Sequence, residues 1–313
     1  MPIEPQEVKK LAEEELLKKF KQIAGISVKH HSPKILRIYV EKLDPSILKE
    51  IPETFLGYKV EVIEVGRVVP LLTPEERQMR WRPIFPGISV GSVLVTAGTL
   101  TGIAKDNEDG EYVLLSNYHV FYGHEGTEIL QPGPYDGGSS PDDVVGHLKR
   151  YVEVKPEPYK NIIDSAIATL EVDADINDRD LGAPARIRDP TEGETVIKSG
   201  RTTAVTRASI IDTEATIRVR DYPGVGDVWF DDIIVTEAFA AGGDSGSIVF
   251  GSDGSMVGQV FAGSDKITCI IKASNIVNAL NITPMFGTPR IGIARVGIIP
   301  LAVLSAIPIF MKK

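Results

Sequence analysis

About a dozen short apolar runs, separated by Gly, Asp and Pro turns, fill the chain between residues 92 and 271. They cover residues 92–96, 100–104, 112–115, 144–148, 165–170, 195–198, 208–212, 215–219, 232–236, 247–250, 256–262 and 267–271. Short strands at near-regular spacing are typical of β-sandwiches and β-barrels. The runs divide about evenly near residue 183, so the pattern predicts a mainly β fold. We expect two six-stranded antiparallel barrels over residues 87–182 and 183–280, the second with a closing helix.

The sequence ahead of the barrels has another pattern. Residues 7–23 carry apolar side chains at roughly helical spacing among Lys and Glu. The stretches that are typical of strands follow at residues 26–28, 35–40 and 58–65. With a short helix after Asp44, this order predicts a small α-β-β-α-β module over residues 1–66. Residues 67–86, which are basic and contain prolines, are expected to be an irregular linker that wraps the next domain.

The net charge and the cysteine content indicate which binding partners and which cellular compartment to expect. The net charge is −9, so nucleic-acid phosphates would be repelled and we expect no nucleic-acid partner. Cys269 is the single cysteine, which excludes an intramolecular disulfide and fits a reducing compartment. Residues 1–5 are polar and acidic, without the basic and apolar regions of a signal peptide. We therefore expect a cytoplasmic protein.

Residues 242–246, Gly-Gly-Asp-Ser-Gly, form a loop directly before the apolar strand 248–250. Glycines on both sides of Ser245 let the backbone bend sharply and let a substrate come close. Such a loop can aim a hydroxyl and successive N–H groups at one spot, which is what acyl transfer requires. The alternative is an ordinary hairpin turn, which the same residues also favour.

Two further residues lie at the edges of predicted strands. His119 follows the apolar run that ends in Ser-Asn-Tyr, and Asp164 precedes the small-residue run Ser-Ala-Ile-Ala. Each alone is typical of an ordinary strand-end residue. All five histidines precede Ser245, which excludes the hydrolases whose chain order is Ser, acid, His. The order His119, Asp164, Ser245 remains compatible with a catalytic triad.

These motifs together resemble the chymotrypsin-like serine proteases. The resemblance is carried by Ser-Asn-Tyr-His-Val at 116–120, Asp-Ser-Ala-Ile-Ala at 164–168 and Gly-Asp-Ser-Gly-Ser at 243–247. Leu-Gln-Pro-Gly-Pro at 130–134 with Asp-Gly-Gly at 136–138, and Lys-Ser-Gly-Arg-Thr-Thr at 198–203, are similar to a cytosolic branch of prokaryotes and plants. That branch includes the narrow-leaf protease of rice, and the resemblance covers residues 1–280.

The resemblance implies a serine endopeptidase acting on protein or peptide substrates. Ser245 would be the nucleophile, His119 the general base and acid, and Asp164 the residue that orients the imidazole. The backbone N–H groups of Gly243 and Ser245 would form the oxyanion hole. Phe239 takes the place where enzymes that cut after Lys or Arg carry an acid, so an apolar primary pocket is expected.

The same resemblance implies that residues 260–263, with Phe261, Ala262 and Gly263, form the pocket wall and pair with the substrate backbone. Two departures stand out: Val120 replaces a cysteine of the secreted members, and no activation sequence precedes the first barrel. Asp244 therefore needs a partner other than a newly freed N-terminus, or it simply shapes the turn.

Other functions stay open at this point. A non-catalytic, oligomeric binding module on a protease fold is one alternative, because a fold does not determine a function. An esterase with the same triad is another. We expect no cofactor and no metal: the adjacent His30 and His31 would point to opposite faces of a strand and could not chelate from one face.

The C-terminal tail, residues 281–313, contains the uncharged apolar stretch 296–311. A spanning helix needs about 20 apolar residues, and Pro300 and Pro308 weaken a continuous helix. An exposed apolar segment of this length would promote aggregation. We therefore expect it to be buried between subunits of a homo-oligomer, with a membrane anchor through 296–311 as the alternative.

Overall fold

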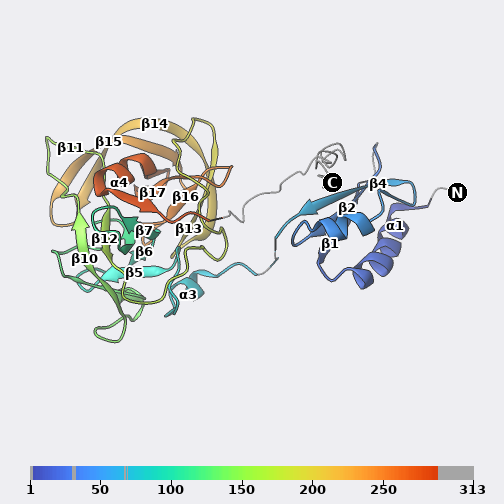
Figure 1. The fold of residues 1–313 in the computed structure, drawn as a ribbon. Coiled ribbons are helices and arrows are strands. Elements are labelled where there is room, and N and C mark those ends of the chain that lie inside the picture. The colour runs from blue at the N-terminus through green and yellow to red at the C-terminus, as the bar shows by residue number, and fades with distance from the viewer. Residues whose placement is uncertain (1–2, 30–32, 67, 69, 288–313) are drawn as a thin grey trace, which may run out of the picture. The chain divides into compact units, whose positions relative to one another are not determined.

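The computed structural model describes residues 3–29, 33–66, 68 and 70–287. The pair His30-His31 and the apolar stretch 296–311 lie outside the described residues. The chain separates into two compact units, with the boundary between Pro70 and Leu71 (Figure 1). Within the described residues, no helix is long and apolar enough to cross a bilayer.

The first unit is a four-stranded sheet with helical segments packed on it. Its elements are α1 (Pro5–Ala12), the π-helical turn η1 (Glu13–Leu17), β1 (Ile23–Lys29), β2 (Ile35–Val40), α2 (Pro45–Glu50), β3 (Thr54–Phe55) and β4 (Tyr58–Glu64). The strand order is β1-β2-β4-β3, and β2 and β4 run parallel because α2 lies between them in the chain. Val8 and Leu16 from the helical segments pack with Leu36 and Ile38 of β2 in one apolar core.

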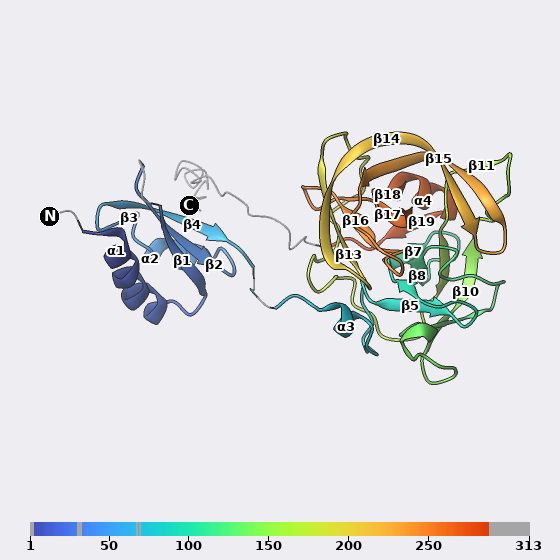
Figure 2. The ribbon, with the colours of Figure 1, turned by 180° about the vertical axis from the view of Figure 1, so that it is seen from behind.

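The second unit is almost entirely β and contains two curled sheets (Figures 1 and 2). The first sheet comprises β5 (Ser89–Ser92), β6 (Gly98–Thr99), β7 (Gly102–Asp106), β8 (Tyr112–Ser116), β9 (Glu128–Leu130), β10 (Val144–Tyr151), β12 (Ala166–Thr169) and β19 (Ile282–Pro284). Its order is β19-β7-β8-β12-β10-β9-β5-β6, and the short 3-10 helix η2 (Pro134–Asp136) follows β9 in the chain. The inner faces of these strands enclose an apolar core, for example through Leu114 and Val145.

The second sheet closes on itself. It contains β11 (Lys160–Asn161), β13 (Thr195–Gly200), β14 (Ala204–Tyr222), β15 (Gly226–Glu237), β16 (Ile248–Phe250), β17 (Met256–Gly263) and β18 (Ile267–Lys272). The order is β11-β15-β14-β13-β16-β17-β18, and an additional β15–β18 pairing joins the ends into a ring of six strands. The helix α4 (Ala273–Leu280) follows, and the chain then returns to the first sheet as β19.

Several features differ from the sequence-based expectation: residues 93–96 include a turn where a strand was expected, and residues 282–284 of the expected tail form β19. The runs 208–212 and 215–219 are one strand, β14, because no turn residue interrupts them; bulges instead shift its register against β15. The stretch expected to be an irregular linker contains α3 (Pro74–Arg77), whose start is capped by Thr73 and Glu76. Arg77 is fully buried, contacts Asp180, and donates to the Ser199 hydroxyl at 2.6 Å.

Candidate active site

His119 lies just after the end of one strand of the first sheet, and Asp164 lies just before the start of its antiparallel neighbour, so the two residues meet at the same edge. His119 follows β8, and Asp164 precedes β12, which pairs with β8. The Nδ1 atom of His119 lies 2.5 Å from Oδ2 of Asp164, and the backbone N–H of His119 donates to Oδ1 at 3.1 Å. Asp164 is fully buried, whereas the His119 side chain is 19% exposed. With Nδ1 engaged by the carboxylate, Nε2 is the ring nitrogen left to accept a proton.

Tyr222 is a third partner of this pair and was missed by sequence reasoning. Its hydroxyl donates to Oδ1 of Asp164 at 2.8 Å, and its ring meets His119 edge-on at a centroid distance of 6.1 Å. Tyr222 is the last residue of β14, far from Asp164 in the sequence. Burial and the nearby Asp164 charge raise the pKa of Tyr222 far above its usual value, so the phenol stays protonated and can donate.

Ser245 lies in the second sheet's glycine loop, against the first sheet. Its carbonyl accepts from the Thr99 N–H at 2.7 Å, which joins the two curled sheets at Ser245. Its hydroxyl donates to the Phe261 carbonyl at 3.3 Å, and among the described residues it makes no hydrogen bond with His119. Catalytic hydrogen bonds often tighten only when substrate binds.

The backbone of the loop 242–246 is held from outside. The Thr202 hydroxyl donates to the Gly242 carbonyl at 2.8 Å, and the Thr99 hydroxyl donates to the Gly243 carbonyl at 2.9 Å. In a trans peptide, the C=O of one residue and the N–H of the next point in opposite directions. The bond from Thr202 to the Gly242 carbonyl therefore turns the Gly243 N–H to the opposite side of the loop. Gly243 has φ of +93°, which a residue with a side chain rarely adopts.

Among the residues that the structure describes, the N–H groups on either side of Asp244 have no hydrogen-bond acceptor. Those of Asp244, Gly246 and Ser247 donate to backbone carbonyls. Within the described part of the chain, those of Gly243 and Ser245 have no hydrogen-bond acceptor. Backbone N–H groups are almost always satisfied in folded proteins, so these two donors remain available to a ligand.

Asp244 has a buried cationic partner within the chain. Its Oδ2 lies 3.2 Å from Nζ of Lys198, and both side chains are fully buried. The Thr203 hydroxyl and the N–H groups of Ala241, Thr202 and Thr203 also donate to this carboxylate. Burial alone would raise the pKa of Asp244, but the Lys198 charge and these donors outweigh it and hold the pKa below the usual value. Burial lowers the pKa of the Lys198 ammonium.

The two sequence segments at 130–138 and 198–203 meet in space. The Arg201 guanidinium pairs with the Asp136 carboxylate, with Nε to Oδ2 at 2.6 Å. Lys198 of the same segment holds Asp244, as described above. The segment 198–203 therefore connects the loop 242–246 to the segment that follows β9 of the first sheet.

A buried polar chain runs beneath the site. Gln259 of β17 accepts from the Asn117 amide at 2.9 Å and from the Ser165 hydroxyl at 2.6 Å. Its amide donates to the Thr101 hydroxyl at 2.5 Å, which in turn donates to the Gly246 carbonyl at 2.6 Å. Asn117 also donates to the Asp164 carbonyl at 2.7 Å. These bonds connect the backbone of Asp164 with that of the loop 242–246.

The residues expected to bind substrate occupy different environments. Phe239 is 7% exposed and belongs to an apolar core with Val196 and Ile270. Phe261 is also buried, and its ring packs on Phe230 at a centroid distance of 4.7 Å. Ala262 is half-buried and Gly263 exposed. The structure thus brings the Phe261 carbonyl to Ser245 and places the Phe239 side chain in the core.

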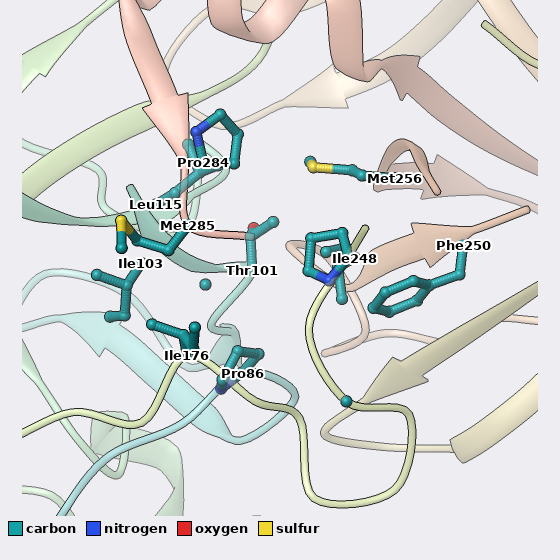
Figure 3. Close-up of a pocket in the computed structure, with 13 residues that line it drawn as sticks. Pro86, Thr101, Ile103, Leu115, Ile176, Ile248, Phe250, Met256, Pro284 and Met285 are labelled. Atoms are coloured by element: carbon teal, nitrogen blue, oxygen red, sulfur yellow. The ribbon is translucent and has the colours of Figure 1, made fainter. Parts of the chain in front are cut away.

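An apolar pocket lies between the two sheets (Figure 3). Its wall includes Ile103, Leu115, Ile248, Phe250 and Met285. None of the residues that line it is among the predicted catalytic or substrate-binding residues. The pocket is therefore distinct from the candidate active site.

No known family model and no curated protein matches the chain. Among solved structures, it is similar to Thermobifida fusca protease A, at 17% identity, with 65% of this chain and 99% of that chain covered and a TM-score of 0.49. The Nocardiopsis protease is 18% identical, with coverages of 64% and 97% and a TM-score of 0.49. Cellulomonas bogoriensis chymotrypsin is 15% identical, with coverages of 65% and 99% and a TM-score of 0.48. At such identities, a similarity of backbones does not establish this chain's activity.

Proposed function

We propose that the protein is a serine endopeptidase that hydrolyses peptide bonds through a covalent acyl-enzyme on Ser245. The observation that carries this proposal is the pair of unpaired N–H groups, on Gly243 and Ser245, beside the serine hydroxyl. The buried contact between Asp164 and His119 supports it, because it leaves Nε2 as the ring nitrogen that can take a proton.

Acylation uses each of these groups in turn. Once substrate draws the Ser245 hydroxyl from the Phe261 carbonyl, Oγ attacks the scissile carbonyl and its proton passes to Nε2 of His119. The oxyanion that develops accepts hydrogen bonds from the Gly243 and Ser245 N–H groups, each worth about 3 kcal/mol in comparable sites. Asp164 stabilises the imidazolium, which then protonates the leaving amine as the C–N bond breaks.

Deacylation repeats these steps with water. His119 takes a proton from the water as its oxygen attacks the acyl carbon, and returns the proton to Ser245 when the ester bond breaks. The Lys198–Asp244 pair supports a loop that is competent in the intact chain, because it needs no freed N-terminus. We therefore propose activity without proteolytic activation.

Substrate class and context complete the proposal. We propose protein or peptide substrates. The preference for apolar P1 residues stays a prediction from the sequence position of Phe239, because the structure places that side chain in the core. We also place the chain in the cytosolic branch that it resembles, on the motifs at 130–138 and 198–203, which contact one another through Asp136 and Arg201. Residues 282–284 of the expected tail form β19 of the first sheet, and association through the apolar stretch 296–311 stays a prediction.

A peptide library tests this specificity. The purified full-length protein should cleave after Leu, Phe, Val or Ala in preference to Lys or Arg, and Ser245→Ala should remove the cleavage. A clear Lys or Arg preference would contradict the predicted preference for apolar P1 residues. Turnover of esters without turnover of any peptide would indicate an esterase.

A further inference from the structure

The hairpin formed by β14 and β15 is long enough to reach from the second sheet to the first. In Figures 1 and 2 these two strands form the long curved ribbon over one side of the second unit. The ladder ends at the pair Tyr222 and Gly226, which flank the tip. A Cβ on Gly224, at the tip, would lie 2.6 Å from the Tyr122 hydroxyl, so the tip lies against the loop that follows His119.

The hairpin also holds the segment that leads into Asp164. Lys160 and Asn161, which form β11, pair in parallel with Trp229 and Phe230 of β15. The Asn161 side chain donates to the Trp229 carbonyl at 3.0 Å. Asn161 lies three residues before Asp164, so the chain on this side of the carboxylate is tied to the hairpin.

The Tyr222 hydroxyl completes the attachment at the carboxylate itself. Tyr222 is 4% exposed, and its ring packs against Phe230, which in turn packs on Phe261. Oδ1 of Asp164 accepts from Tyr222 and from the His119 backbone, which leaves Oδ2 for the imidazole. Each carboxylate oxygen of Asp164 therefore has its own hydrogen-bond partners, and rotation of the carboxylate would break hydrogen bonds at both oxygens.

We propose that Tyr222 is a positioning residue of the candidate site, and that the β14–β15 hairpin carries it to Asp164 from the opposite sheet. The proposal rests on the proposed peptidase function, because positioning matters only if His119 acts as a base. The hydroxyl fixes the rotation of Asp164 and spreads the carboxylate's negative charge. Without it, more of that charge falls on the imidazolium, so His119 holds its proton to higher pH.

Tyr222→Phe removes this hydroxyl and keeps the ring. We expect kcat/KM to fall about tenfold or more, mainly through kcat, because a charge-assisted hydrogen bond is lost. The acid limb of the kcat/KM profile should move to higher pH, which a change in packing alone would not produce. Tyr118→Phe is the matched control: its hydroxyl donates to the Gly123 carbonyl at 3.1 Å, and it should leave the pH profile unchanged.

Two further measurements keep the outcome decisive. Histidine NMR, with the His119 signal assigned from His119→Ala, should show a higher His119 pKa in Tyr222→Phe than in the wild type. Gly224→Ala should displace the hairpin tip from Tyr122 and change kcat/KM and the pH profile in the same direction. This variant serves as the test if Tyr222→Phe does not fold.

The outcomes separate the two proposals. If the wild type hydrolyses peptides and Tyr222→Phe keeps its kcat/KM and pH profile, the positioning role is wrong and the peptidase stands. If the wild type has no activity but its His119 pKa still changes in Tyr222→Phe, the positioning contact stands and the proposed function is wrong. An unchanged His119 pKa would overturn the positioning role in either case.

Discussion

Replacing Lys198 with methionine should destabilise the second unit and disable the nucleophile loop. Methionine keeps most of the lysine volume but removes the ammonium that lies 3.2 Å from the Asp244 carboxylate. Both side chains are fully buried, and removing one partner of a buried pair costs about 3–5 kcal/mol. Asp244 keeps the Thr203 hydroxyl and nearby backbone N–H groups, so we expect the lower end, about 3 kcal/mol.

Chemical denaturation followed by tryptophan fluorescence measures this loss of stability. Peptide hydrolysis measures whether the loop 242–246 still supports activity. Lys198→Met should lose activity even where it is fully folded, because Asp244 immediately precedes Ser245. Lys198→Met with Asp244→Asn should recover part of the stability, since no uncompensated charge then remains buried. Lys272→Met is the control: the Asp232 carboxylate that it would leave unpaired is 39% exposed, so water can solvate it and the loss should be smaller than for Lys198→Met.

Two results would refute this reasoning. One is a Lys198→Met variant that loses less stability than Lys272→Met. The other is a double variant that is less stable than Lys198→Met alone, because the carboxylate would then not be the source of the cost. Either would show that Lys198 does not balance the Asp244 charge.

Two further predictions concern the same loop. Thr202→Val should lower kcat about tenfold with little change in KM, because the Gly242 peptide loses the bond that orients the Gly243 N–H. Thr202→Ser should restore kcat. Equal kcat values in the two variants would contradict this prediction. The pKa of Asp244 is held below its usual value, so its stabilisation is complete above the unfolded pKa near 4 and is lost as pH falls through the lower folded pKa. Between neutral and acidic pH, the free energy of unfolding should therefore fall less steeply in Asp244→Asn than in the wild type. Identical slopes would count against the ion pair.

The local sequence carries the information for the strands and for the three motif residues. His119 and Asp164 each lie at the edge of an apolar run, and antiparallel pairing of β8 with β12 brings such edges together. The loop around Ser245 is equally local, since its bend depends on its own glycines. These three positions can therefore be proposed from the amino-acid sequence alone.

The supporting residues depend on contacts between distant segments. Tyr222 reaches Asp164 only because β14 continues through two runs that the sequence suggests are separate strands. Gln259 joins residues of both sheets, and an isolated glutamine in a strand does not indicate its partners. Lys198 could have been suspected, because a lysine within the apolar strand 195–200 requires a buried counter-charge, but the sequence does not show which acid supplies it.

Covalent labelling of Ser245 by a fluorophosphonate probe tests the central claim most directly. The probe reacts with a serine only where a base and an oxyanion site activate it. Intact-mass analysis and peptide mapping of the full-length protein should show one adduct, on Ser245, which Ser245→Ala abolishes and His119→Ala slows severely. If the folded wild type takes up no probe on Ser245 at any pH between about 6 and 9, the serine peptidase proposal is wrong.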